Sequence, residues 1–171
     1  MPLGAEGASN PILAGVRDSK EMTSRQRELW ARRIREIALA VGVGEAASLD
    51  VDGIGPLRAT RLAMHRALQA LAIEPRFLLL DFMRLPEIPL PQTCLPHGDG
   101  LALSISAASV IAKVWRDEGM KAIEGSYPGY GFARHKGYGT ASHREALGRL
   151  GPCPIHRSSF APVASLLAAA A

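Results

Sequence analysis

The sequence predicts a single α/β domain, because amphipathic helical segments alternate along the chain with short apolar segments of strand length. With 171 residues and 47% hydrophobic content, the chain has enough apolar material for one buried core. The longest apolar run falls well short of the roughly 20 residues that span a bilayer, so a transmembrane helix is excluded. We assign the domain to residues 1–163, with an irregular start over 1–16 and an alanine-rich, frayed tail over 164–171.

The helices are predicted from apolar spacing and from end signals. Thr23 and Gln26 form a capping box, and Gly55-Pro56 opens a second helix, since proline is favoured in the first helical turn. The predicted helices cover residues 24 to about 40, 56–73, about 104–124 and 142–150.

The strands are predicted from short, nearly continuous apolar runs. One is expected over 40–46, where the residues become uniformly small and apolar, another over 76–80, directly before Asp81, and a third over Gln92 to Leu95. The connection between the last two is punctuated by prolines.

Charge and cysteine content narrow the class of protein. The net charge is +4, and arginines outnumber lysines 16 to 4, which suits bidentate phosphate contacts but also follows from GC-rich coding. Cys94 and Cys153 lack the spacing of a zinc site, so we interpret them as reduced thiols in a cytoplasmic protein. The first sixteen residues lack a basic start and an apolar block, so no secretory signal is predicted.

Two aspartates are candidate metal ligands. Asp81 ends a buried strand, where α/β sheets place their ligands, and Asp99 lies between two glycines after the next strand. If the intervening strand returns the chain to the same edge, the two carboxylates meet, and their repulsion is relieved by a hard cation such as Mg²⁺ or Mn²⁺. A helix cap for Asp81 and a surface turn for Asp99 are the structural alternatives.

The loop Tyr127–Gly139 is a candidate nucleic-acid contact. It combines four aromatic rings with four glycines and the basic side chains Arg134, His135 and Lys136. Glycines let backbone amides approach phosphates, basic groups neutralise them, and rings stack on bases or sugars. An Ω-loop anchored on its own rings is the alternative.

Taken together, several motifs resemble bacterial ribonuclease HII, from about Gly15 to Val163. The matching segments are Asp18-Ser19-Lys20, Ser104 to Val114 with Arg116-Asp117, Tyr127 to Phe132, His135 to Thr140, and Gly151-Pro152 through His156-Arg157 to Ser159-Phe160.

The resemblance implies an RNase H-like fold, with a mixed sheet flanked by helices and a C-terminal substrate-binding region. It implies hydrolysis of the RNA strand of RNA–DNA hybrids by two-metal catalysis with Mn²⁺ or Mg²⁺. Asp81 and Asp99 match the third and fourth of the family's four metal-binding carboxylates, and Tyr138 matches a tyrosine that packs on the ribonucleotide. The remaining expected nucleic-acid contacts are Lys136, His135, Arg134, Lys113 and Arg157. A monomer is the family's usual state.

The sequence departs from the family pattern at important places. Nothing matches the family's first strand, which carries an Asp-Glu pair and a Gly-Arg-Gly motif, so we expect an N-terminally truncated chain that is inactive or impaired. Phe82-Met83 replaces the usual Gly-Asn after Asp81, and His97 and Gly100-Leu101 replace more polar neighbours of Asp99. A non-catalytic hybrid-binding remnant is therefore the main alternative, followed by a fragment of an unrelated nuclease or transposase.

Overall fold

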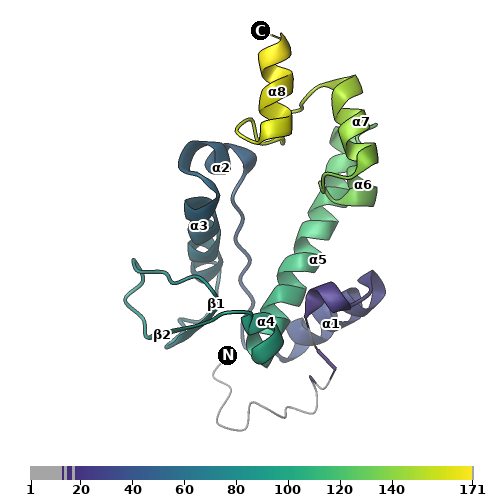
Figure 1. The fold of residues 1–171 in the computed structure, drawn as a ribbon. Coiled ribbons are helices and arrows are strands. Elements are labelled where there is room, and N and C mark those ends of the chain that lie inside the picture. The colour runs from purple at the N-terminus through teal and green to yellow at the C-terminus, as the bar shows by residue number, and fades with distance from the viewer. Residues whose placement is uncertain (1–12, 14, 17, 171) are drawn as a thin grey trace. The chain divides into compact units, whose positions relative to one another are not determined.

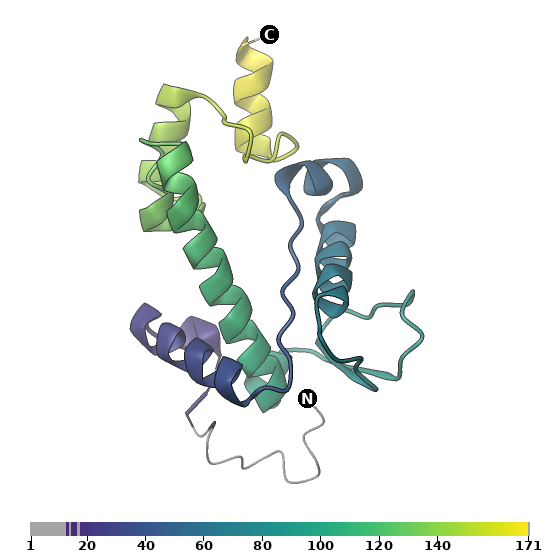
Figure 2. The same cartoon turned by 180° about the vertical axis from the view of Figure 1, so that it is seen from behind.

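The computed structural model describes residues 13, 15, 16 and 18–170, which have an α/β fold (Figure 1). The elements in chain order are η3 (Ser19–Glu21), α1 (Ser24–Ile37), α2 (Ser48–Ile54), α3 (Pro56–Gln69), β1 (Leu78–Asp81), β2 (Gln92–Leu95), α4 (Gly98–Leu101), α5 (Leu103–Ser126), α6 (Phe132–His135), α7 (Ala141–Leu150) and α8 (Ala161–Ala170). The same elements are seen from behind in Figure 2. None of the described helices is long and apolar enough to cross a membrane.

The described chain divides into two compact units. The first contains the residues up to Val43 together with 66–115, and the second contains 44–65 and 116–170. The predicted single domain over 1–163 stays a prediction, and its irregular start lies largely outside the described residues.

The sheet of the first unit consists of β1 and β2, which pair in parallel from Leu78 opposite Gln92 to Asp81 opposite Leu95. Both strands follow the sequence prediction closely. The Gln92 side chain closes the proline-rich connection between them: its Nε2 donates to Leu85 O at 2.7 Å and to Ile88 O at 2.8 Å, and its Oε1 accepts from Leu85 N at 3.0 Å. The pairing places Asp81 at the carboxyl end of the sheet.

The core of the first unit joins α1 to the first half of α5. Thr23 and Gln26 form the predicted capping box of α1, which directs Ala31 and Ile34 towards α5. On α5 the buried partners are Ala107, Val110, Ile111 and Val114. The long predicted helix is therefore confirmed and supplies one side of this core.

The strand predicted over 40–46 is wrong, because these residues form an extended segment without ladder pairing. A Cβ atom on Gly42 would lie 2.2 Å from Ala67 O and 3.1 Å from Leu71 N, so the segment runs directly against the backbone at the end of α3. The small residues of this segment allow the close approach to α3. Leu39, which precedes the segment, is 68% exposed. Helix α2 follows without having been predicted.

The core of the second unit gathers side chains from α5, α6, α7 and α8. The rings of Tyr130 and Phe132 stack at 5.1 Å, and Met120, Leu147 and Val163 close around them. Residues 164–170, expected as a frayed tail, continue α8, since Val163 anchors the helix in this core. Residues 164–170 are therefore helical, the disordered or frayed tail stays a prediction, and Ala171 lies outside the described residues.

Asp52 of α2 binds the segment that precedes α8. Its carboxylate accepts from Ser158 N at 2.7 Å and Ser158 Oγ at 2.8 Å, and from Ser159 N at 3.0 Å and Ser159 Oγ at 2.5 Å. These four hydrogen bonds hold the pKa of Asp52 far below its ordinary value, the Oγ of Ser159 contributing most.

Candidate functional site

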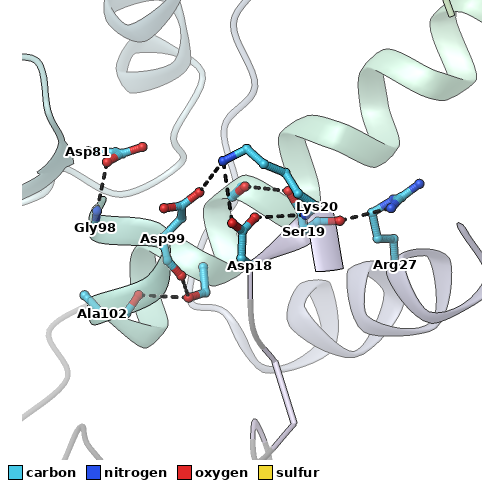
Figure 3. Close-up of polar contacts among 10 residues, drawn as sticks. Asp18, Ser19, Lys20, Arg27, Asp81, Gly98, Asp99 and Ala102 are labelled. Atoms are coloured by element: carbon cyan, nitrogen blue, oxygen red, sulfur yellow. Dashed lines mark hydrogen bonds and ion pairs between the residues drawn. The ribbon is translucent and has the colours of Figure 1, made fainter. Parts of the chain in front are cut away.

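Asp81 leaves β1 towards the start of α4. Its Oδ1 accepts a hydrogen bond from Gly98 N at 2.9 Å (Figure 3). A Cβ atom on Gly98 would lie 2.6 Å from Ile105 Cδ1 and 3.5 Å from Asp81 Oδ1, so a side chain at this position would require the end of the Ile105 side chain to move. The Asp81 carboxylate is thereby held at the backbone of the residue that directly precedes Asp99 in the chain.

Asp99 is buried within the short helix α4, at 7% exposure. Its Oδ2 accepts from Lys20 Nζ at 2.9 Å, and its backbone carbonyl accepts a short hydrogen bond from Ser106 Oγ. The bond from Lys20 is the main cause of the lowered pKa of Asp99, and it outweighs the opposing effect of burial. Asp99 is therefore an ionised carboxylate at neutral pH.

Lys20 is a site residue that the sequence did not single out, although it belongs to a matching motif. Its Nζ also lies 3.6 Å from Asp18 Oδ2, so one ammonium faces two carboxylates (Figure 3). Asp18 caps η3 by accepting from Lys20 N at 2.9 Å, and Ser19 Oγ lies 2.8 Å from Ser109 Oγ of α5. Arg27 also donates to the carbonyl of Ser19, so the turn is fixed on both sides.

The pocket beside this cluster is open and carries charged groups. Its lining includes Asp18, Lys20, His97, Asp99 and Ser106. The structure thus brings Asp99 and Lys20 to a solvent-accessible hollow of the first unit.

The donor chemistry of Asp81 and Asp99 fits a hard divalent cation, because their oxygens are ligands that Mg²⁺ and Mn²⁺ prefer. Mg²⁺ is commonly held by one or two carboxylates with several retained waters, so side chains of this type suit a hydrated ion; Asp99 lines the open pocket, and Asp81 is not among its lining residues. Among the residues that the structure describes, no three histidines, cysteines or carboxylates gather closely enough to hold a metal. A two-ion site is not assembled by these residues.

The basic and aromatic loop of the second unit contains the short helix α6. Tyr138 is 60% exposed, and Arg134 is also exposed. Lys136 adopts a left-handed backbone with φ of 54°, and its Nζ donates to Ala133 O. Arg157 is exposed on the later segment of the same unit, so these positions remain candidates for contact with a nucleic acid.

Two of the expected contacts have different surroundings. Lys113 is half-buried on α5 and belongs to the first unit. His135 is 8% exposed, its Nε2 lies 2.7 Å from Tyr130 O, and its Nδ1 accepts from Gly137 N at 3.2 Å. The His135 ring therefore supports the loop from inside.

His143 and His156 join His135 in the interior, and sequence reasoning did not find them as a group. The Nε2 atoms of His143 and His156 lie 3.3 Å apart, and His156 Nδ1 lies 3.1 Å from Cys153 Sγ. Burial lowers the pKa of both histidines and raises the pKa of the Cys153 thiol. Neither His143 nor His156 carries a sequence signal for this contact, since the two residues come from a helix and a separate loop.

Comparison with known proteins identifies a matching family. The family model described as Ribonuclease HII matches residues 10–163. The chain is 51% identical over 156 residues to "Ribonuclease HII" of Synechococcus sp. (strain JA-3-3Ab), covering 91% of this chain and 70% of that protein. It is 47% identical to "Ribonuclease HII" of Thermus thermophilus over 91% of this chain and 81% of the relative.

The share of the relatives that is covered varies. The chain spans 58% of the Ribonuclease HII of Desulfitobacterium hafniense (strain Y51), to which it is 48% identical over 88% of its own length. Among solved structures, the ribonuclease H2 of Pyrococcus horikoshii OT3 is similar with a TM-score of 0.76, covering 93% of this chain and 84% of that one. At 21% identity, this likeness shows the fold.

Proposed function

The chain belongs to the ribonuclease HII family, a family of endoribonucleases, and from this membership we propose that it acts on the RNA strand of RNA–DNA hybrids. The proposed reaction is hydrolysis of a phosphodiester bond, including at a single embedded ribonucleotide, leaving 5′-phosphate and 3′-hydroxyl ends. The observation that carries the proposal is the approach of Asp81 to the backbone immediately before Asp99, through its bond to Gly98 N.

In this proposal Asp81 and Asp99 bind the family's divalent cation, Mn²⁺ or Mg²⁺. When bound, the cation activates water and stabilises the charge of the phosphate during hydrolysis. Gly98 N–H orients the Asp81 carboxylate, while Ser106 fixes the backbone of Asp99. The Lys20 ammonium lies against Asp99 Oδ2 and offsets its negative charge in the absence of other cations.

The substrate contacts that we propose lie on both units. Tyr138 stacks against the ribonucleotide, and its exposure leaves much of the ring accessible. Arg134, Lys136 and Arg157 contact phosphates from the second unit's surface, and Lys113 does so from the first. We further propose that the protein works in the cytoplasm as a monomer.

The 171-residue chain by itself is inactive or impaired in this proposal. Two divalent ions need more ligands than the proposed two carboxylates to hold them against their hydration, and the described residues contain no group of three or more candidate ligands. The second candidate function, a hybrid-binding protein without catalysis, is favoured by Phe82, a bulky residue with φ of 61° directly after Asp81.

The test compares the chain with a chimera that carries the N-terminal strand of the Synechococcus relative. Both are mixed with a labelled DNA duplex containing one ribonucleotide, in Mn²⁺ buffer. We expect cleavage at the ribonucleotide by the chimera, little or none by the chain alone, and none by the chimera with Asp99→Asn.

The outcomes separate the alternatives. A folded chimera that binds the duplex without cleaving it supports the non-catalytic function. Full cleavage by the unaltered chain contradicts the proposed impairment but supports the nuclease, whereas an active Asp99→Asn chimera contradicts the proposed site.

A further inference from the structure

Three histidine rings of the second unit lie close together, and one of them contacts the backbone carbonyl of Tyr138. His135 and His143 stack with their centroids 4.2 Å apart, and His143 Nε2 lies 3.3 Å from His156 Nε2. Among the described residues these rings belong to no group able to hold a metal ion. Their hydrogen bonds therefore have to explain why polar rings occupy this interior.

One end of the cluster is His156, which contacts Cys153. Cys153 N donates to His156 Nδ1 at 3.0 Å, and the same Nδ1 also lies 3.2 Å from Cys153 O, so these contacts alone do not assign the proton of His156. The Nε2 atom of His156 faces His143.

The other end assigns the proton of His143. His143 Nδ1 lies 2.9 Å from Tyr138 O, and a carbonyl can only accept, so Nδ1 is protonated and Nε2 is the acceptor of the neutral ring. His156 Nε2 therefore donates to His143 Nε2, which leaves His156 Nδ1 free to accept from Cys153 N. The resulting chain of hydrogen bonds runs from Cys153 through His156 and His143 to Tyr138.

His135 holds the backbone of Tyr138 at its N–H. Tyr138 N donates to His135 O at 2.9 Å, while the His135 ring accepts from Gly137 N and lies against Tyr130 O. The backbone of Tyr138 is thus fixed at both its N–H and its carbonyl, whereas its side chain is 60% exposed.

The chain requires neutral rings, because a proton added to His143 Nε2 would face the Nε2–H of His156 at 3.3 Å, and one added to His156 Nδ1 would face the N–H of Cys153 at 3.0 Å. Burial lowers the pKa of His143 and of His156, in agreement with this requirement. The titratable groups around them are His135 of α6, Tyr130 of the preceding turn and Cys153 of the loop. Helices α5 and α8 contribute Met120, Ile123, Val163 and Leu166 to this core, and Tyr127, which directly follows α5, adds a further titratable side chain.

We propose that His143 and His156 are positioning residues that orient Tyr138 towards the hybrid through this chain of neutral imidazoles. The inference rests on the proposed role of Tyr138 in substrate binding. The two histidines touch no reacting atom, and they act by holding the carbonyl of the residue whose ring meets the ribonucleotide.

The experiment measures binding of a fluorescent DNA duplex with one ribonucleotide, by anisotropy in Ca²⁺ buffer. We expect His143→Leu to weaken binding by roughly threefold to tenfold, the scale of one lost hydrogen bond. His143→Asn retains a donor at the position of Nδ1 and is expected to bind nearly as the unaltered protein does. His143→Leu should add nothing in a Tyr138→Ala background, because interacting residues show non-additive effects.

Two further readouts separate positioning from a structural role. Nitrogen-15 NMR should show the Nδ1-protonated form of His143 and the Nε2-protonated form of His156. Binding should weaken below the ordinary histidine pKa of 6.5 more steeply in the unaltered protein than in His143→Asn.

The results that overturn the inference are distinct from those that overturn the proposed function. If Tyr138→Ala binds the duplex with full affinity, Tyr138 has no role in substrate binding. The proposed contact of Tyr138 with the ribonucleotide and the positioning role of the histidines are then both refuted. If Tyr138→Ala weakens binding while folded His143→Leu does not, or if NMR shows the opposite tautomers, the positioning role alone is refuted.

Discussion

Replacing Gln92 by alanine should destabilise the protein through the connection between β1 and β2. The side chain makes three hydrogen bonds to the backbone of Leu85 and Ile88, and Leu85 itself is fully buried. Each such bond contributes about 1 kcal/mol net, and the Leu85 carbonyl keeps a second donor in Ile88 N. The expected loss of unfolding free energy is therefore about 2 kcal/mol.

The assay is thermal unfolding followed by circular dichroism. A loss of about 2 kcal/mol lowers Tm by roughly 4–8 °C in a chain of this size. Thr93→Ala is the matched control, since Thr93 is exposed on the same strand, and it should change Tm little. Equal Tm values for the Gln92 and Thr93 variants would show that the connection is not held by this side chain.

Three other perturbations test the remaining features. Gly98→Ala should destabilise the protein by about 1–2 kcal/mol, since the new Cβ meets Ile105. Gly100→Ala is the control, because a Cβ there meets nothing within 4 Å, and it should not destabilise the protein. Equal midpoints of urea unfolding for the two variants would contradict the packing argument. Lys20→Met should tighten Mn²⁺ binding in calorimetry, because the ammonium no longer competes for Asp99, and unchanged or weaker binding would oppose this. Because the pKa of Asp52 is lowered from its ordinary value of 3.8, its ionised carboxylate stabilises the fold at pH values above about 4. The unaltered protein should therefore have a higher Tm than Asp52→Ala at neutral pH, and this difference should shrink as the pH falls below about 4. A difference in Tm that does not depend on pH would exclude the charge as its cause.

The sequence predicts those elements whose signals are local. The apolar run after Pro75 ends at Asp81, so the strand and its terminal carboxylate could both be predicted. The capping box at Thr23 likewise depends on residues three positions apart. These features need no knowledge of the tertiary structure.

Other features depend on contacts that no local pattern records. Helix α2 escaped prediction because its N-cap, Ala47, has no side-chain oxygen and Gly53 lies within it. Lys20 and Asp99 are separated by 79 positions, so their ion pair exists only once η3 and α4 are placed together. The hydrogen bond of His143 with His156 similarly follows from the packing of α7 against the next loop.

Gly98 links the interior of the first unit to its acidic site. The amide of this residue fixes Asp81, and a Cβ atom on it would lie 2.6 Å from Ile105 Cδ1 and 3.3 Å from Leu95 Cβ. A change in the volume of either apolar neighbour would shift the amide, and with it the direction of the carboxylate. Substitutions of these aliphatic neighbours therefore offer a route for tuning the affinity for the proposed ion without altering any acidic side chain.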